Sequence, residues 1–170
     1  MANWILWHSA GPPANVRTSV DNALPSDTML TLGEVSSNTI GTYNLNGKNQ
    51  TVAAIQTAGT GTTQTITTFA GNSTLTVAPT GNNNYGGLLS GNLGLVKAAG
   101  GTLTLSKLGG NSYSGGTTIS NGALYVTNTS NSATGNGGVL VQAAGTLAGN
   151  GIKSSPWQPW TKRLRKMLWI

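Results

Sequence analysis

Residues that could carry acid–base chemistry are few in this chain, and they gather near its N-terminus. The acidic residues are Asp21, Asp27 and Glu34, and His8 is the one histidine. General acid–base catalysis, a glycosidase carboxylate pair and a Ser–His–acid triad all need several titratable side chains held together. No Asp, Glu or His occurs in residues 35–170, so none of these sites can form there. Asp21 and Asp27 flank a turn-like Asn-Ala-Leu-Pro segment and are expected at the surface. We predict that the protein is not an enzyme.

Metal and nucleotide sites are excluded on similar grounds. The chain has no cysteine and one histidine, which leaves no zinc site of Cys and His ligands. The glycine clusters at 59–61 and 135–138 are not followed by Gly-Lys-Ser or Gly-Lys-Thr, so turns explain them better than phosphate loops do. No Asp follows these glycines as in the calcium-binding glycine-rich repeat. We therefore expect no cofactor and no metal.

Positive charge is concentrated at the C-terminal end. The net charge is +6, but residues 15–151 hold four basic residues against three acidic ones and are close to neutral. Clustered cations bind phosphates and tryptophan favours a membrane interface, so the C-terminal tail is the candidate contact with nucleic acid or an anionic membrane. A solvated extension after a shifted reading frame or a truncation junction is the simpler interpretation of the tail. The candidate contact residues are Lys153, Lys162, Arg163, Arg165, Lys166, Trp157, Trp160 and Trp169.

The rest of the chain consists of short segments in which apolar residues alternate with Thr or Ser and are cut by Gly or Asn. Such alternation predicts half-buried strands joined by tight turns. Leu75, Leu95, Leu124 and Leu147 recur about twenty residues apart, a spacing typical of repeat architectures. We predict a right-handed parallel β-helix, with an antiparallel β-sandwich as the alternative. The expected strands are 29–32, 42–45, 51–55, 65–69, 74–77, 94–97, 102–105, 117–120, 123–126, 139–141 and 146–148.

One part of this pattern carries a family resemblance. Gly-Thr-Leu-Thr-Leu-Ser at 101–106 is followed by Asn-x-Tyr-x-Gly-Gly-Thr-Thr-Ile at 111–119 and by Gly-x-Leu-x-Val at 122–126. The order resembles the autotransporter-associated β-strand repeat, which occurs in exported passenger regions of bacterial surface proteins. The resemblance covers about residues 15–151, with Lys107–Gly109 as an insertion. It implies a secreted or cell-surface β-helical stalk or adhesin scaffold.

Composition divides the chain into three parts. Residues 1–14 are expected to be an irregular, non-repeat N-terminus, residues 15–151 the repeat segment, and residues 152–170 a basic, Trp-rich tail outside the solenoid.

Residues 1–14 lack the basic start and long apolar core of a signal peptide, and no run of about twenty apolar residues suits a membrane helix. The chain is therefore expected to be a piece of a longer exported protein.

The functional prediction follows from these parts. We predict a structural segment without catalysis, and we expect it to self-associate through exposed coil edges. The alternative is a binding module for glycans or for a host or partner surface, in which exposed tyrosines stack on the ligand. The tyrosines available for this purpose are Tyr43, Tyr85, Tyr113 and Tyr125.

Any affinity for DNA or anionic vesicles should reside in the tail, because residues 15–151 are nearly neutral. Binding should weaken with added salt, since the Debye length is about 8 Å at physiological ionic strength and falls beyond it. Deletion of residues 152–170 should abolish binding and keep the strand signal in far-ultraviolet circular dichroism. Loss of that signal would show instead that the tail is a packed cap.

Overall fold

In the computed structural model of the protein, the described residues are 3–6, 14–33, 40–59 and 64–152. They contain fourteen β-strands and no helix, and hence no helix that could cross a membrane. The strands are β1 (Asn3–Leu6), β2 (Ala14–Arg17), β3 (Met29–Leu32), β4 (Gly41–Asn44), β5 (Gln50–Val52), β6 (Ala54–Thr57), β7 (Thr65–Thr67), β8 (Ser73–Val77), β9 (Asn82–Tyr85), β10 (Leu88–Leu89), β11 (Leu93–Lys97), β12 (Thr102–Leu105), β13 (Thr117–Val126) and β14 (Val139–Gly149).

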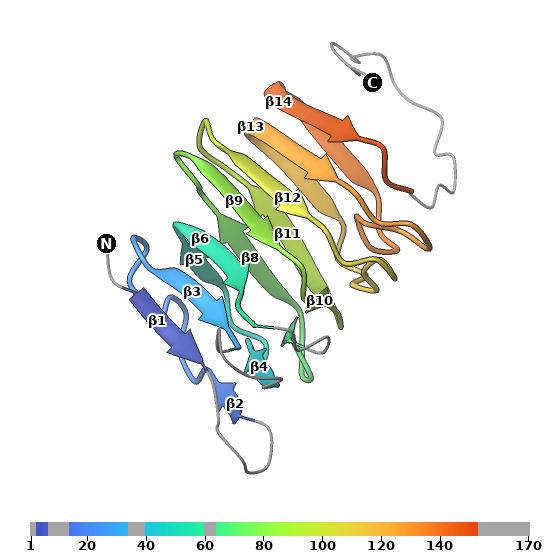
Figure 1. Cartoon of the computed structure of the whole chain (residues 1–170). Coiled ribbons are helices and arrows are strands. Elements are labelled where there is room, and N and C mark those ends of the chain that lie inside the picture. The colour runs from blue at the N-terminus through green and yellow to red at the C-terminus, as the bar shows by residue number, and fades with distance from the viewer. Residues whose placement is uncertain (1–2, 7–13, 34–39, 60–63, 153–170) are drawn as a thin grey trace.

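The strands stack into a parallel β-helix of about five turns (Figure 1). One face carries β1, β3 and β6 in order, and a second carries β2, β4, β7 and β10. The largest sheet joins β5, β8, β11 and β13 to β12 and β9, with β14 beside β13. Every strand pair recorded in these sheets is parallel, which confirms the β-helix and excludes the antiparallel sandwich.

Coil length varies along the stack. Met29 pairs with Ala54, 25 residues later, whereas Thr102 pairs with Ala123, 21 residues later. The spacing of about twenty residues expected from sequence therefore fits the C-terminal coils, and the earlier coils carry extra residues in their corners. The insertion at Lys107–Gly109 lies in a corner of a C-terminal coil, where a 2.9 Å hydrogen bond from Gly110 N to Lys107 O closes a turn.

Alternating side chains build the core in rows that run from coil to coil. In β8 and β11 every second residue is buried and those between are half-buried, as the Thr-Leu alternation predicts. Burying a Leu or Ile side chain contributes about 1.5–3 kcal/mol, so a row gains stability with each coil added. One such row contains Leu103, Leu124 and Leu147, all at most 5% exposed, and the buried Asn83 precedes Leu103 in it.

The N-terminal region differs from the sequence-based expectation. Residues 1–14 were expected to be irregular, yet Asn3–Leu6 forms β1 and pairs with β3, and Ala14 begins β2, which pairs with β4. The physical reason is the free edge of the next coil, which supplies hydrogen-bond partners that local sequence does not reveal. Residues 7–13 and the tail at 153–170 lie outside the described residues.

A glycine allows β13 to cross a corner between two faces without a break. The strand pairs with β11 through Thr117–Ile119 and with β12 through Ala123–Val126, where two separate strands were expected. Between them Gly122 has φ +68°, and a Cβ atom there would lie 2.4 Å from the carbonyl oxygen of Gly101. This corner therefore requires glycine, because only glycine adopts the conformation freely and lets the coils approach this closely.

Gly122→Ala should lower the free energy of unfolding by more than about 1 kcal/mol, because it adds both backbone strain and a steric clash. The matched control is Gly100→Ala in the preceding coil, where an added Cβ meets nothing within 4 Å. That variant should stay within about 0.5–1 kcal/mol of the wild type. Equilibrium urea unfolding measures both changes, and equal effects would contradict the assignment of this corner.

Candidate functional site

The chemically unusual residue of the described chain is Lys97, its one fully buried charged side chain. Lys97 ends β11 and is 0% exposed. Its register partners are Val77 in the coil before and Ile119 in the coil after, both in the core. A buried charge is costly unless hydrogen bonds replace its hydration, so its partners decide what Lys97 does.

Three backbone carbonyls surround the Lys97 ammonium. Its Nζ donates to the oxygens of Ala98 at 2.8 Å, Ala99 at 2.9 Å and Asn121 at 3.0 Å. Ala98 and Ala99 form the turn after β11, and Asn121 lies at the same corner of the next coil. Ser120 Oγ donates to the Lys97 carbonyl at 3.1 Å, so side chains bridge the two coils in both directions. Lys97 is thus a clamp between successive corners.

The protonation of Lys97 fits this structural role. Burial lowers the pKa of its ammonium from 10.5 to about 8, while the three carbonyl acceptors favour the charged form. The side chain is therefore charged at neutral pH. A catalytic lysine needs a neutral amine that substrate can reach, and this amine is enclosed and fully engaged. Among the described residues no group of three His, Cys, Asp or Glu side chains is placed to hold a metal.

Three of the tyrosines are buried, which contradicts the alternative prediction that exposed tyrosines stack on a ligand. Tyr43, Tyr85 and Tyr113 are at most 1% exposed, because each fills space inside the coil. Burial raises the pKa of Tyr43 to about 12 and raises the pKa values of Tyr85 and Tyr113 as well. Tyr125 is half-buried. Phe69 is an aromatic side chain that is exposed, at 71%. Three of the four tyrosines are thus unavailable for stacking on a glycan.

Asparagine side chains join neighbouring coils where the ladder of strands is interrupted. Asn111 Oδ1 accepts from Leu89 N at 2.9 Å, and its Nδ2 donates to Ala133 O at 2.7 Å, so one side chain spans three coils. Asn83 Oδ1 accepts from Ile55 N at 3.1 Å between β6 and β9. These buried amides satisfy backbone groups that would otherwise lack partners.

The acidic residues have structural or surface positions. Asp21 is exposed, and its Oδ1 accepts from Asn49 N at 2.7 Å in the next coil. Asp27 is also exposed. The sequence-based interpretation of both as turn or surface residues is therefore confirmed. Glu34, His8 and all eight candidate contact residues of the tail lie outside the described residues.

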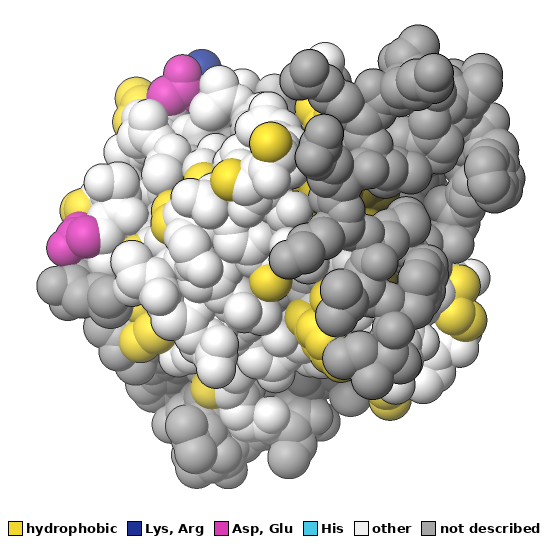
Figure 2. Space-filling view, turned by 90° about the horizontal axis from the view of Figure 1, so that it is seen from above, with side chains coloured by type: hydrophobic (Ala, Val, Ile, Leu, Met, Phe, Trp, Pro, Cys, Tyr) yellow, Lys and Arg dark blue, Asp and Glu magenta, His cyan; other side chains and the backbone are white. Residues whose placement is uncertain are grey.

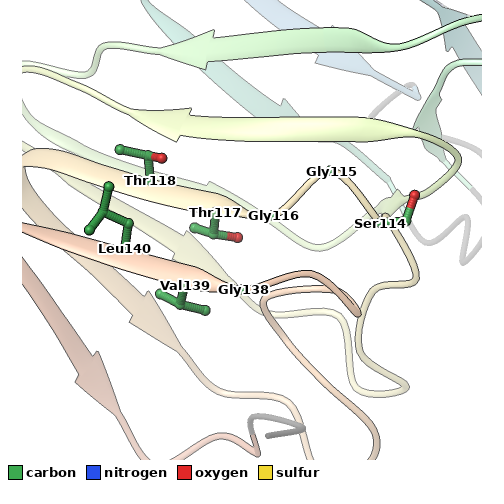
Figure 3. Close-up of a pocket in the computed structure, with 8 residues that line it drawn as sticks. All are labelled: Ser114, Gly115, Gly116, Thr117, Thr118, Gly138, Val139 and Leu140. Atoms are coloured by element: carbon green, nitrogen blue, oxygen red, sulfur yellow. The ribbon is translucent and has the colours of Figure 1, made fainter. Parts of the chain in front are cut away.

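A shallow depression of about 360 Å³ lies where β13 and β14 begin (Figure 3). Thr117 lies beside Val139 and Thr118 beside Leu140 across this strand pair. The remaining lining comes from Ser114 and from Gly115, Gly116 and Gly138. Ser114 Oγ already donates to Asn92 Oδ1 at 2.9 Å. With no titratable lining residue, the depression offers hydrogen bonds and apolar contact but no acid–base chemistry.

Sequence reasoning missed the clamp, although its signal was present. In the alternating run of β11, Leu93 and Leu95 face inward, and Lys97 is the next residue in the same alternation, which predicts that its side chain is buried.

Comparison with known proteins does not identify a family or a function for this chain. No family model, no curated protein and no solved structure matches it.

The unfolding free energy should rise between about pH 8 and pH 10. Lys97 loses its proton near pH 8 when folded and near 10.5 when unfolded, so the unfolded state binds more protons in this window. Lys97 by itself contributes a rise of about 2 kcal/mol. From about pH 9 the three buried tyrosines oppose this rise, because their folded pKa values are raised and the unfolded state loses protons first.

Urea unfolding at several pH values measures this profile. Lys97→Met removes the titrating group but keeps an unbranched side chain of similar length. The rise should therefore be absent from its profile, which should fall from about pH 9 as the tyrosines of the unfolded state begin to lose protons. Equal slopes in the variant and the wild type would contradict the role of Lys97.

Proposed function

We propose that this chain is a structural β-solenoid segment of an exported, autotransporter-like bacterial surface protein. Its role is to hold parts of the parent protein apart as a stalk or adhesin scaffold, without catalysis. The observation that carries the proposal is the use of the polar groups: the buried hydrogen-bonding side chains join one coil to the next instead of converging on a ligand. Lys97 and Asn111 are the leading examples.

The outer surface supports the same role. In β12 the outward residues Thr102 and Thr104 are half-buried, and their register neighbours are Ala123 and Tyr125 in the next coil. In Figure 2, the visible described residues of one face are polar side chains and backbone with scattered hydrophobic side chains, and their charged side chains lie near one margin. This part of the surface is hydrated without a strong field that would attract nucleic acid.

The distribution of titratable groups supports a role without catalysis. Lys97 is enclosed by three carbonyls and has no open side from which a substrate could reach its amine. A catalytic acid or base must lie beside a second functional group in a site that substrate can enter. The depression between β13 and β14 is lined by hydroxyl, glycine and apolar residues and contains no titratable side chain.

The cell-surface part of the proposal rests on the repeat-like segments at 101–106, 111–119 and 122–126 and on the composition. A chain without cysteine gains its stability from stacked coils and needs no disulfides outside the cell.

A display experiment tests the scaffold role. The full chain is placed between an outer-membrane anchor and a reporter epitope, and antibody binding is measured on intact cells before and after limited proteolysis. We expect a protected segment with the epitope retained. In the control, Leu124→Asn breaks a core row and should cost about 2–5 kcal/mol, so the segment should be cleaved. Equal protection of both variants, or turnover of a substrate by the wild type, would count against the proposal.

A further inference from the structure

Among the described residues, β14 is the last strand of the stack and one of its edges is unpaired. It pairs with β13 along one side, and no other strand of the described residues pairs with its second side. Figure 1 shows β14 at the opposite end of the stack from β1. Along Val139–Gly149, alternate backbone N–H and C=O groups therefore point away from β13 and have no strand partner among the described residues. An exposed edge of this length is a template for pairing with another strand.

The side chains of β14 are also less covered than those one coil earlier. Val139 and Val141 are half-buried, whereas their register partners Thr117 and Ile119 are at most 2% exposed. Leu140 is 54% exposed on the outer face of the same strand. A further strand laid against this edge would cover the two valines and bring the end of the stack closer to the burial of its interior.

The edge strand itself carries none of the usual protection against association. Natural sheets blunt their edges with lysine or other charges and with proline. Residues 108–152 contain no charged residue and no proline, so the paired β14 strands themselves would bring no like charges together.

The N-terminal end is a poor complement to β14. In the first coil, residues 18–28 contain no strand, so a head-to-tail copy would leave Val139–Val141 without a partner. Leu24 of that coil packs against the core and covers part of the N-terminal end instead. A second β14, by contrast, offers strand along its whole length.

We propose that β14 is a dimerisation edge, at which two copies of this chain pair their β14 strands antiparallel. The strand bends at the exposed corner Gln142–Ala144, where its register with β13 shifts. A two-fold axis through this corner places the first half of one β14 against the second half of the other. Such an interface is closed, so association stops at two copies. The proposal is independent of the scaffold role and assigns the self-association expected from sequence to one strand.

Sedimentation equilibrium of the full chain at micromolar concentration should show a dimer. Ala144→Lys places two like charges beside the proposed two-fold axis and should raise the dimer dissociation constant at least about tenfold. The control is Leu108→Lys, which also introduces a lysine, at a side chain that is 66% exposed and lies outside β14. That variant should dimerise like the wild type, and circular dichroism checks that both variants fold.

Cysteine cross-linking gives a second, milder test. The chain has no cysteine, so Ala144→Cys introduces a single thiol beside the proposed axis. Mild oxidation should convert the full-length variant to a disulfide-linked dimer, whereas Leu108→Cys should stay largely uncross-linked. A monomeric wild type, a series of growing oligomers, or equal cross-linking of the two variants would overturn the proposal. A monomer would indicate that another segment, such as residues 153–170, covers the edge.

Discussion

Parallel backbone pairing between successive coils is the interaction on which this structure depends. Most strands are only two to five residues long, and strands of this length have no stability alone. Once Leu103 pairs with Leu124, and Leu124 with Leu147, one register fixes both the hydrogen bonds and a continuous apolar row. A slip by one residue would turn every inward side chain outward. The register therefore specifies the core, and the core in turn maintains the register.

The ladder of backbone hydrogen bonds is interrupted at corners and between β6 and β9. At these places polar side chains take the place of backbone hydrogen-bond partners. Asn83 and Asn111 accept from backbone N–H groups of the neighbouring coil, and Lys97 donates to carbonyls of two coils. Removing one partner of such a buried group costs more than the bond itself contributes, since the other partner is left unsatisfied. Residues whose types suggest chemistry are thus used to hold the solenoid together.

The scarcity of charge has consequences at the surface and at the end of the stack. Threonine and asparagine side chains bind water on the outer faces but create no strong electrostatic field. Such a surface suits a scaffold better than a receptor for a charged ligand. The same neutrality leaves β14 without the charges that usually keep sheet edges apart. A solenoid built from uncharged repeats must end in a cap, in further coils or in another copy, because each coil is covered only by its neighbours.

Local alternation determined much of the fold from sequence alone. The expected strands at 29–32 and 102–105 coincide with β3 and β12, because Thr-Leu alternation between turn residues is a short-range signal. The sequence also showed that residues 35–170 contain no Asp, Glu or His that could form a catalytic pair. Only the tertiary structure decided that Asn3–Leu6 is a strand, that Tyr43 and Tyr85 are buried, and that the Lys97 ammonium meets Asn121. Each of these features depends on a residue more than twenty positions away in the chain or on the space enclosed by a complete coil. Sequence periodicity determined which residues face inward, but the stacking of coils decided what each of them meets.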